Sequence, residues 1–378
     1  MQHWDEIFPA IFFFAGLGVC AWFALFTSNA LDVLSRQKWP SYMWPVEKDR
    51  FNWWFYFISG VLGMGFFGFG AVSLMMDIIL AKPSRPAVPQ SFTRMYVAQC
   101  FSNKIFILTP PFKPSQSATA AIAQPCSNSI AFDASTGKLA VASGAVFGKL
   151  SISIYNPPFS SASAPAIAFM PPGLRHPRQI AWDDLGDLWI TDDLAAKVYE
   201  FRAPFSGSSK AIAENTHATQ PVGLAFDIVN RIMFIADAGG ARSCAATLCY
   251  VDVVPAPYTG APVARIALGK NAPTALAVDQ RSRLYVGFEH GALKGQIGVY
   301  LPPFFAGQTA AFTLHAGDAP MSLAFDSAQN LYAQLYSTGG VVRFDGPVTA
   351  PARPTTKFGC PMSARCVRKN WAGLAFGP

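Results

Sequence analysis

The sequence predicts an all-β protein, a six-bladed β-propeller whose C-terminal strand pairs with the first blade, preceded by two transmembrane α-helices. Three observations support this prediction. A short apolar strand ending in Asp recurs at intervals of about 47 residues, which suits one four-stranded blade. Gly and Pro number 30 each, which favours turn-rich β-structure. Two long, nearly uncharged apolar segments lie close to the N-terminus.

The amino-acid composition argues against one class of partner. Charged residues make up only 13% of the 378 residues, compared with about a quarter in an average soluble protein. The formal net charge is +7, but the Lys and Arg residues form no run. Because nucleic-acid binding requires a concentrated basic surface, a nucleic-acid partner is not expected.

Residues 1–81 are predicted to form a membrane anchor with helices at about 8–27 and 53–80. The first of these segments has twenty residues without a charge, the length that one bilayer crossing requires. A cleaved signal peptide is the alternative, but nothing basic precedes the segment and its apolar core is too long. The second segment has one charge, Asp77, close to one end, where the membrane interface can solvate it.

The basic residues predict the orientation of this anchor. Arg36, Lys38, Lys48 and Arg50 lie between the two helices, whereas no Lys or Arg precedes the first helix. Since positively charged loops stay cytoplasmic, both termini and the propeller are expected on the periplasmic side of a bacterial inner membrane.

The second helix is rich in small residues, which allow another helix to approach closely in lipid. These residues are Ser59, Gly60, Gly63, Gly65, Gly68 and Gly70. Their partner is either the first helix of this chain or a helix of a larger complex, and the sequence leaves both open. Neither helix contains His, so a haem or chlorophyll ligated within the membrane by this chain is not expected.

A linker with three Pro, 82–93, precedes the propeller, which is predicted to span 94–378. Each repeat begins with a Pro followed by an entry strand that contains Ala and ends in Asp. The entry strands are Ser129–Asp133, Gln179–Asp183, Gly223–Asp227, Ala275–Asp279 and Ser322–Asp326. We expect the Ala to lie at the crowded centre of the ring and the next residue, such as Phe132 or Phe226, to fill space between blades.

A second signature, an X-Pro pair and an aromatic residue, closes each repeat. Its six copies are Pro110–Phe112, Pro157–Phe159, Ala203–Phe205, Ala256–Tyr258, Pro302–Phe304 and, degraded, Gly346–Pro347. The closing signature occurs six times, but only five entry strands precede it. The first blade, which contains Met95–Leu108, therefore lacks one strand. Trp371–Phe376 is similar to an entry strand and is expected to complete this blade, so that the ring closes without a free edge.

Two segments, Leu188–Asp193 and Phe234–Gly240, resemble the strand-and-turn core of NHL-repeat propellers, in which an apolar pair, a small residue and Asp precede a turn. The resemblance covers about residues 94 to 378. It implies a propeller of the kind that mostly acts as a binding platform, although a fold alone does not establish a function.

The cysteines predict disulfides. Six of the seven lie in the propeller, namely Cys100, Cys126, Cys244, Cys249, Cys360 and Cys366. An even number in a periplasmic domain favours pairing. Cys244 with Cys249 and Cys360 with Cys366 are the natural local pairs, which leaves Cys100 with Cys126. No Cys-x-x-Cys is present, so neither a zinc site nor c-type haem is expected.

No group of residues has the spacing of a catalytic site. The Asp that ends each entry strand is expected to hydrogen-bond its own turn, because a catalyst would not recur in every blade. The pairs Asp183-Asp184 and Asp192-Asp193 are a weak lead to a Ca²⁺ site. The His residues of this part are expected to be loop or surface residues without a partner. They are His176, His217, His290 and His315.

We therefore expect a non-catalytic periplasmic propeller without a cofactor, an accessory or scaffolding subunit of a membrane assembly such as a bacterial photosynthetic or respiratory complex. Its expected partners are integral membrane subunits at the helices, proteins docking on the propeller face, and lipid. The alternatives are a membrane-tethered lactonase or gluconolactonase-like metal-dependent hydrolase and a solute-binding receptor. The hydrolase needs several oxygen ligands in the channel, but Glu200, Glu214 and Glu289 all lie outside the entry strands.

A count of free thiols tests the periplasmic placement. We expect the unfolded, unreduced protein to show one reactive thiol, that of Cys20 in the first helix, because the other six are paired. Reduction before unfolding is the control and raises the count to seven. Six or seven free thiols without reduction would contradict the placement.

Overall fold

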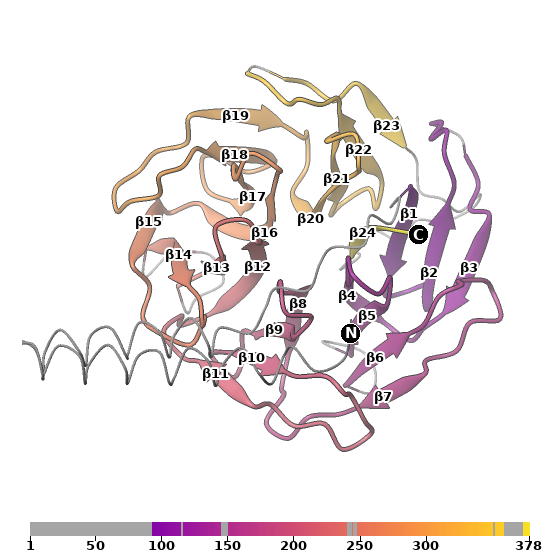
Figure 1. Cartoon of the computed structure of the whole chain (residues 1–378). Helices are drawn as coiled ribbons and strands as arrows, with labels where there is room; N and C mark the ends of the chain where they lie inside the picture. The colour runs from indigo at the N-terminus through magenta and orange to yellow at the C-terminus, as the bar shows by residue number, and fades with distance from the viewer. Residues whose placement is uncertain are drawn as a thin grey trace, which may run out of the picture. The chain divides into compact units, whose positions relative to one another are not determined.

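The computed structural model describes residues 93–114, 116–144, 150–239, 244, 248–350, 352–358 and 373–378. In these residues twenty-four strands form six four-stranded antiparallel sheets, arranged around a centre as blades (Figure 1). The predicted six-bladed propeller is therefore confirmed. The predicted anchor, 1–81, and all of the linker except Thr93 lie outside the described residues, among which no helix has the length and apolarity to cross a membrane.

Each blade runs from the innermost strand outward. Blade 1 has β24 (Leu374–Gly377), β1 (Arg94–Gln99), β2 (Lys104–Leu108) and β3 (Ala120–Ala123). Blade 2 has β4 (Ser127–Phe132), β5 (Leu139–Ser143), β6 (Ser151–Tyr155) and β7 (Ile167–Phe169). Blade 3 has β8 (Pro177–Trp182), β9 (Leu188–Asp192), β10 (Lys197–Phe201) and β11 (Ala213–Asn215).

The other three blades repeat this order. Blade 4 has β12 (Pro221–Asp227), β13 (Ile232–Asp237), β14 (Cys249–Pro255) and β15 (Ala264–Gly269). Blade 5 has β16 (Ala272–Val278), β17 (Leu284–His290), β18 (Gln296–Tyr300) and β19 (Phe312–His315). Blade 6 has β20 (Pro320–Phe325), β21 (Leu331–Leu335), β22 (Val341–Phe344) and β23 (Thr356–Phe358).

The two ends of the chain share blade 1, as the sequence predicts. β24 pairs antiparallel with β1, with Met95 opposite Phe376. The Tyr96 hydroxyl donates a hydrogen bond to the carbonyl of Pro378 at 2.9 Å. Because β24 supplies the innermost strand of this blade, the ring closes without a free strand edge on either terminus. Trp371 lies outside the described residues.

The buried side chains form six clusters, and each cluster lies between two neighbouring blades. The entry strands follow one rule. The Leu or Ile before the Ala packs against the preceding blade, as Leu224 does beside Trp189, while the Ala faces the following blade, as Ala225 does in the cluster of Leu276. The Ala is thus small because it receives the large side chain of the next entry strand.

Aromatic residues also fill these interfaces. The signature residue Phe159 lies with its ring centroid 5.6 Å from Tyr96 of blade 1 and 5.5 Å from Phe132. Tyr258 takes the same place between blades 3 and 4, at 5.6 Å from Trp189 and 5.1 Å from Phe226. The expected filling of the space between blades by aromatic residues is confirmed. All six signatures contain a cis X-Pro bond.

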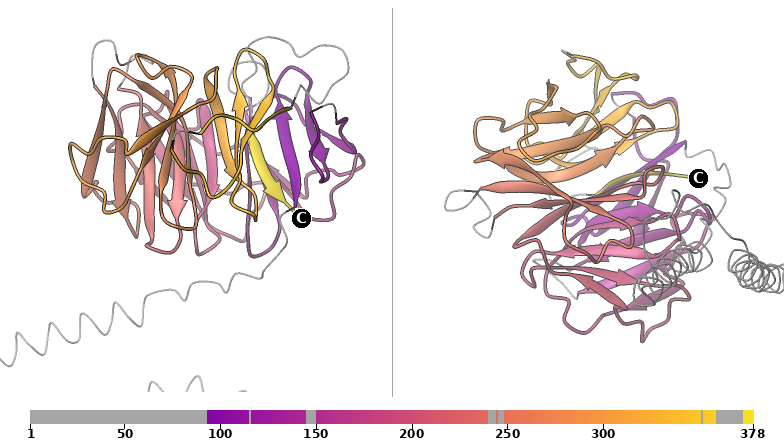
Figure 2. Two further views of the ribbon diagram at one scale, coloured as in Figure 1. Left: turned by 90° about the horizontal axis from the view of Figure 1, so that it is seen from above. Right: turned by 60° about the vertical axis from the view of Figure 1, so that its left-hand side comes forward.

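The disc has two different faces because the innermost strands all run in the same direction. Successive entry strands lie side by side in similar register, since Ser129 accepts a hydrogen bond from Ile180, one position beyond its equivalent Gln179. We call the side where these strands begin, at residues such as Pro221, the entry face. The side where they end, at residues such as Asp227, is the exit face. Arg94 pairs with Gly377, so β1 begins and the chain ends at the exit face (Figure 2).

Replacing Phe376 tests whether closure stabilises the whole ring. Phe376 is 6% exposed and lies 4.8 Å from the ring of Tyr332 in blade 6. We expect Phe376→Ala to lower the free energy of unfolding by about 3 kcal/mol, because a buried aromatic ring is replaced by a cavity at the seam. Urea unfolding followed by circular dichroism measures this change.

The matched control is Phe305→Ala. Phe305 is 55% exposed, and we expect its loss to change stability by less than about 0.5 kcal/mol. Equal effects of the two substitutions would show that closure by β24 does not determine stability.

Candidate functional site: the channel mouth at the entry face

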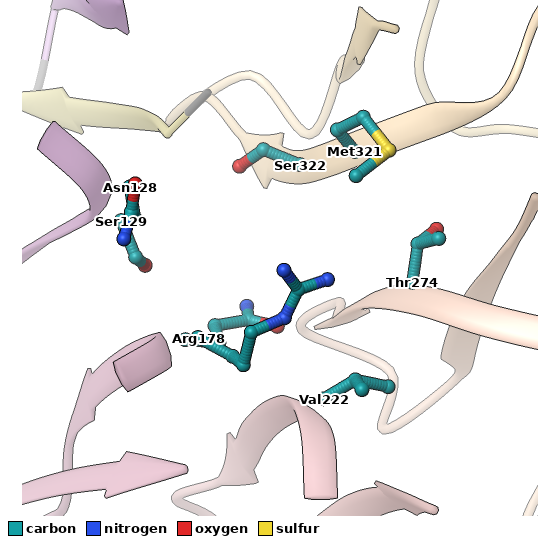
Figure 3. A pocket seen from close by; sticks show the side chains of 8 residues that line it. Asn128, Ser129, Arg178, Val222, Thr274, Met321 and Ser322 are labelled. Atoms are coloured by element: carbon teal, nitrogen blue, oxygen red, sulfur yellow. The ribbon is translucent and has the colours of Figure 1, made fainter. Parts of the chain in front are cut away.

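A small cavity opens at the centre of the entry face. Figure 3 shows the side chains around it, which come from the beginnings of five entry strands. They are Asn128, Ser129, Arg178, Gln179, Val222, Thr274, Met321 and Ser322. None of these residues stood out as a site candidate in the sequence, although each follows the Pro of its repeat by one to four residues.

β-Bulges direct many of these side chains into the cavity. In five of the six blades the pairing of the entry strand with its neighbour shifts near the start of the strand, for example between Pro221 and Gly223 and between Pro320 and Ser322. One residue, Val222 or Met321, is thereby left without a cross-strand partner. Such an extra residue bends the strand and changes the direction of its side chain. The same irregularity occurs in β4, β8 and β16.

The polar side chains beside the bulges join neighbouring blades. Ser129 Oγ accepts the N–H of Ile180 at 3.1 Å, Gln179 Oε1 accepts that of Leu224 at 3.0 Å, and Ser322 Oγ accepts that of Leu374 at 3.0 Å. These three bonds link blades 2 to 3, 3 to 4 and 6 to 1. An innermost strand has one edge without a strand partner, and its buried N–H groups need acceptors. The ring of polar residues therefore has a structural role.

The cavity itself is small. It has about 20 Å³ of free space, enough for about one water molecule. Arg178 is the one charged residue that lines it, and its guanidinium group points toward the space between Thr274 and Ser322 in Figure 3. The enclosed part of the mouth can hold water or a very small polar group.

His176 corrects one sequence-based expectation. It is 3% exposed and contacts the carboxylate of Asp193, which also lies 3.8 Å from Arg178 Nε. His176 and Asp193 are seventeen positions apart in the sequence, but the pairing of β8 with β9 brings Pro177 opposite Asp192 and so joins them. The other three His are exposed, as expected.

The recurring Asp residues bind their own turns. In all five described repeats the Asp accepts a backbone N–H from a residue two to four positions later, as Asp279 does from Arg281 and Arg283 at 2.9 Å. In blades 3, 5 and 6 a buried aromatic residue six positions later also donates to the carboxylate. These donors are Trp189, Tyr285 and Tyr332. Burial, together with the nearby Asp279 charge, raises the pKa of Tyr285, which keeps this donor protonated.

The acidic pairs considered for Ca²⁺ already contact donors of the protein. Asp184 lies 3.2 Å from Arg231 Nε and accepts the hydroxyl of Tyr258. Asp192 accepts hydrogen bonds from four backbone N–H groups, two just before β8 and two just after β9. In the described part of the chain, no three His, Cys, Asp or Glu residues lie close enough together to ligate a metal ion.

Among the described residues, three carboxyl groups have a raised pKa, and burial is the main cause for each. They are Asp183, Glu200 and Asp252. Such groups are candidates for proton donors. However, none lines the cavity, and Arg202 and Arg265 bind Glu200 and Asp252 at 2.8 and 2.6 Å.

The structure contains two of the expected disulfides, Cys100–Cys126 and Cys244–Cys249. The first connects the end of β1 to the start of β4 and so fastens blade 1 to blade 2. A loop of this length contributes about 3.5 kcal/mol in the chain-entropy model. Cys360 and Cys366 lie outside the described residues, as do the small residues of the second predicted helix.

Replacing Gln179 tests the structural role of the polar ring. Gln179→Met keeps the length of the side chain but removes the acceptor of the Leu224 N–H. We expect a loss of about 2 kcal/mol of folding stability, measured by urea unfolding, because a buried donor is left unsatisfied. Gln280→Met, at an exposed Gln, is the control and changes stability by less than about 0.5 kcal/mol. Equal effects would contradict the role.

Comparison with known proteins supports the fold but identifies no function. No family model matches the chain, and no curated protein matches it. A crystal structure of a protein of unknown function from Bacteroides caccae is similar, with a TM-score of 0.50 and 10% sequence identity. The likeness covers 75% of this chain and 97% of that one. At this identity the two proteins share a fold, and nothing further follows.

Proposed function

We propose that the protein is a non-catalytic, membrane-anchored periplasmic β-propeller that acts as an accessory or scaffolding subunit of a multi-subunit membrane complex. One observation carries the proposal. At the channel mouth, a concave place where a ligand site would be expected, the polar side chains join blades and the enclosed space is about that of one water molecule.

The stiffness of the disc supports a role in binding other proteins. Neighbouring blades are joined by six buried clusters, by the polar ring and by the Cys100–Cys126 disulfide. A rigid surface loses little conformational entropy when it docks, which favours affinity. The function then depends on the loops that differ between blades rather than on the repeat.

The disulfides support a placement outside the cytoplasm. Structural disulfides persist mainly in oxidising compartments. Together with the two apolar segments of the sequence, they favour a propeller held at the outer side of the inner membrane, with the Gly-rich second helix contacting other membrane subunits.

Isolation from native membranes tests this proposal. We expect mild-detergent extraction and native mass measurement to give the chain in fixed stoichiometry with other integral membrane proteins. A lone, metal-loaded monomer with esterase activity would instead favour the lactonase-type hydrolase.

A variant identifies the contact. Gly63 and Ser59 are four residues apart and share one face of the predicted helix. We expect Gly63→Leu to weaken co-migration because the larger side chain separates the helices, and Val61→Leu, on another face, to leave it unchanged. Unchanged co-migration in both variants would exclude this face as the contact.

A further inference from the structure

We propose that the channel mouth at the entry face binds one small monovalent anion, of the size of chloride, between the guanidinium group of Arg178 and the hydroxyl groups of neighbouring blades. Residues of the propeller alone form this site, so it depends on neither the membrane anchor nor a partner subunit. Three features of the lining support the assignment: its charge, the hydrogen bonds of its hydroxyls, and the size of the space that it encloses.

The charge of the lining is positive. Among the described residues, Arg178 is the one charged residue that lines the cavity, and its side chain is 10% exposed. Asp193 approaches Nε of Arg178 at 3.8 Å, which is longer than a hydrogen bond, and its other carboxylate oxygen contacts His176. Asp193 thus offsets part of the charge at Nε, whereas the terminal nitrogens extend into the space between Thr274 and Ser322 (Figure 3). A guanidinium group buried in this way is stabilised by an anion that accepts its N–H groups.

The serine hydroxyls of the lining are arranged as donors. Ser129 Oγ accepts the N–H of Ile180 at 3.1 Å, and Ser322 Oγ accepts that of Leu374 at 3.0 Å. A hydroxyl that accepts a backbone N–H keeps its own hydrogen for another acceptor. For Ser322 the structure offers the carbonyl of Leu374 at 3.5 Å, which is longer than a normal O–H···O bond. An anion in the cavity would be a better acceptor.

These hydrogen bonds favour an anion over a water molecule or a cation. A buried water molecule donates two hydrogen bonds and needs acceptors around it, whereas a halide ion only accepts. The oxygens of Ser129 and Ser322 are already used by backbone N–H groups, and Val222 of blade 4 is apolar. A cation would be repelled by Arg178.

The enclosed space suits a single ion. It has about 20 Å³ of free space, enough for one water-sized occupant, and chloride is only slightly larger than water. The lining comes from the entry strands of blades 2 to 6, so that an ion at this place contacts several blades at once. Because the unfolded chain has no such cavity, binding stabilises the folded ring.

Thermal unfolding of the full chain in detergent, followed by circular dichroism, tests the proposal. Sodium chloride replaces sodium gluconate, whose anion is much larger, at constant ionic strength. We expect the melting temperature to rise by about 3 °C once chloride reaches about ten times its dissociation constant, and then to level off. Arg178→Gln should abolish this rise. The matched control is Arg281→Gln, which removes an exposed Arg at the exit face and should retain it. Each variant is compared with itself in gluconate, so that a change in its basal stability does not enter.

Crystals of the full chain grown in sodium bromide locate the ion directly and keep the proposal testable if Arg178→Gln does not fold. We expect an anomalous bromide peak within about 3.5 Å of a terminal nitrogen of Arg178. The absence of a peak at the channel mouth would overturn the proposal, as would an equal rise in melting temperature in Arg178→Gln and Arg281→Gln. A bromide peak without any chloride-dependent rise would show binding at crystal concentration only and would also overturn it.

Discussion

The packing of each blade against its two neighbours is the interaction on which the rest of this structure depends. A four-stranded sheet this small cannot bury enough apolar surface alone. Here both faces of every blade are covered, and the buried residues divide into six clusters of the same design. Within each, the entry-strand Leu or Ile of one blade lies over the Ala of the preceding one. The repeat of Ala in the sequence is therefore a requirement of the interface.

Closure completes this arrangement because the ring is held together only when all six interfaces between blades are formed, including the one that joins the two ends of the chain. The seam lies between blades 6 and 1, where Phe376 and Phe112 of blade 1 contact Tyr332 of blade 6. β24 contributes to the seam from the end of the chain. The Cys100–Cys126 disulfide strengthens the next interface in the ring, between blades 1 and 2.

At the centre of the disc, the polar side chains that could have formed a substrate-binding site instead stabilise the fold. The bulged ends of the entry strands converge there, and in other circumstances such convergence would give ligands or catalytic groups. In this chain Ser129, Gln179 and Ser322 instead satisfy backbone groups of the neighbouring blade. The differences between blades lie in their outer connections, such as the apolar turn at Val229 and the disulfide-bound loop ending at Cys249.

The sequence by itself determined the number of blades, the closing strand and the turn role of the recurring Asp, because each depends on a local pattern repeated at a fixed interval. It also predicted two disulfide pairs, from the even number of cysteines and the short spacing of the local pairs. Only the tertiary structure decided the channel mouth and the partner of His176. Bulges redirect residues such as Val222 and Met321. Strand pairing brings His176 to Asp193 across seventeen residues. Neither effect leaves a periodic trace in the sequence, since both depend on which backbone groups meet when the strands assemble.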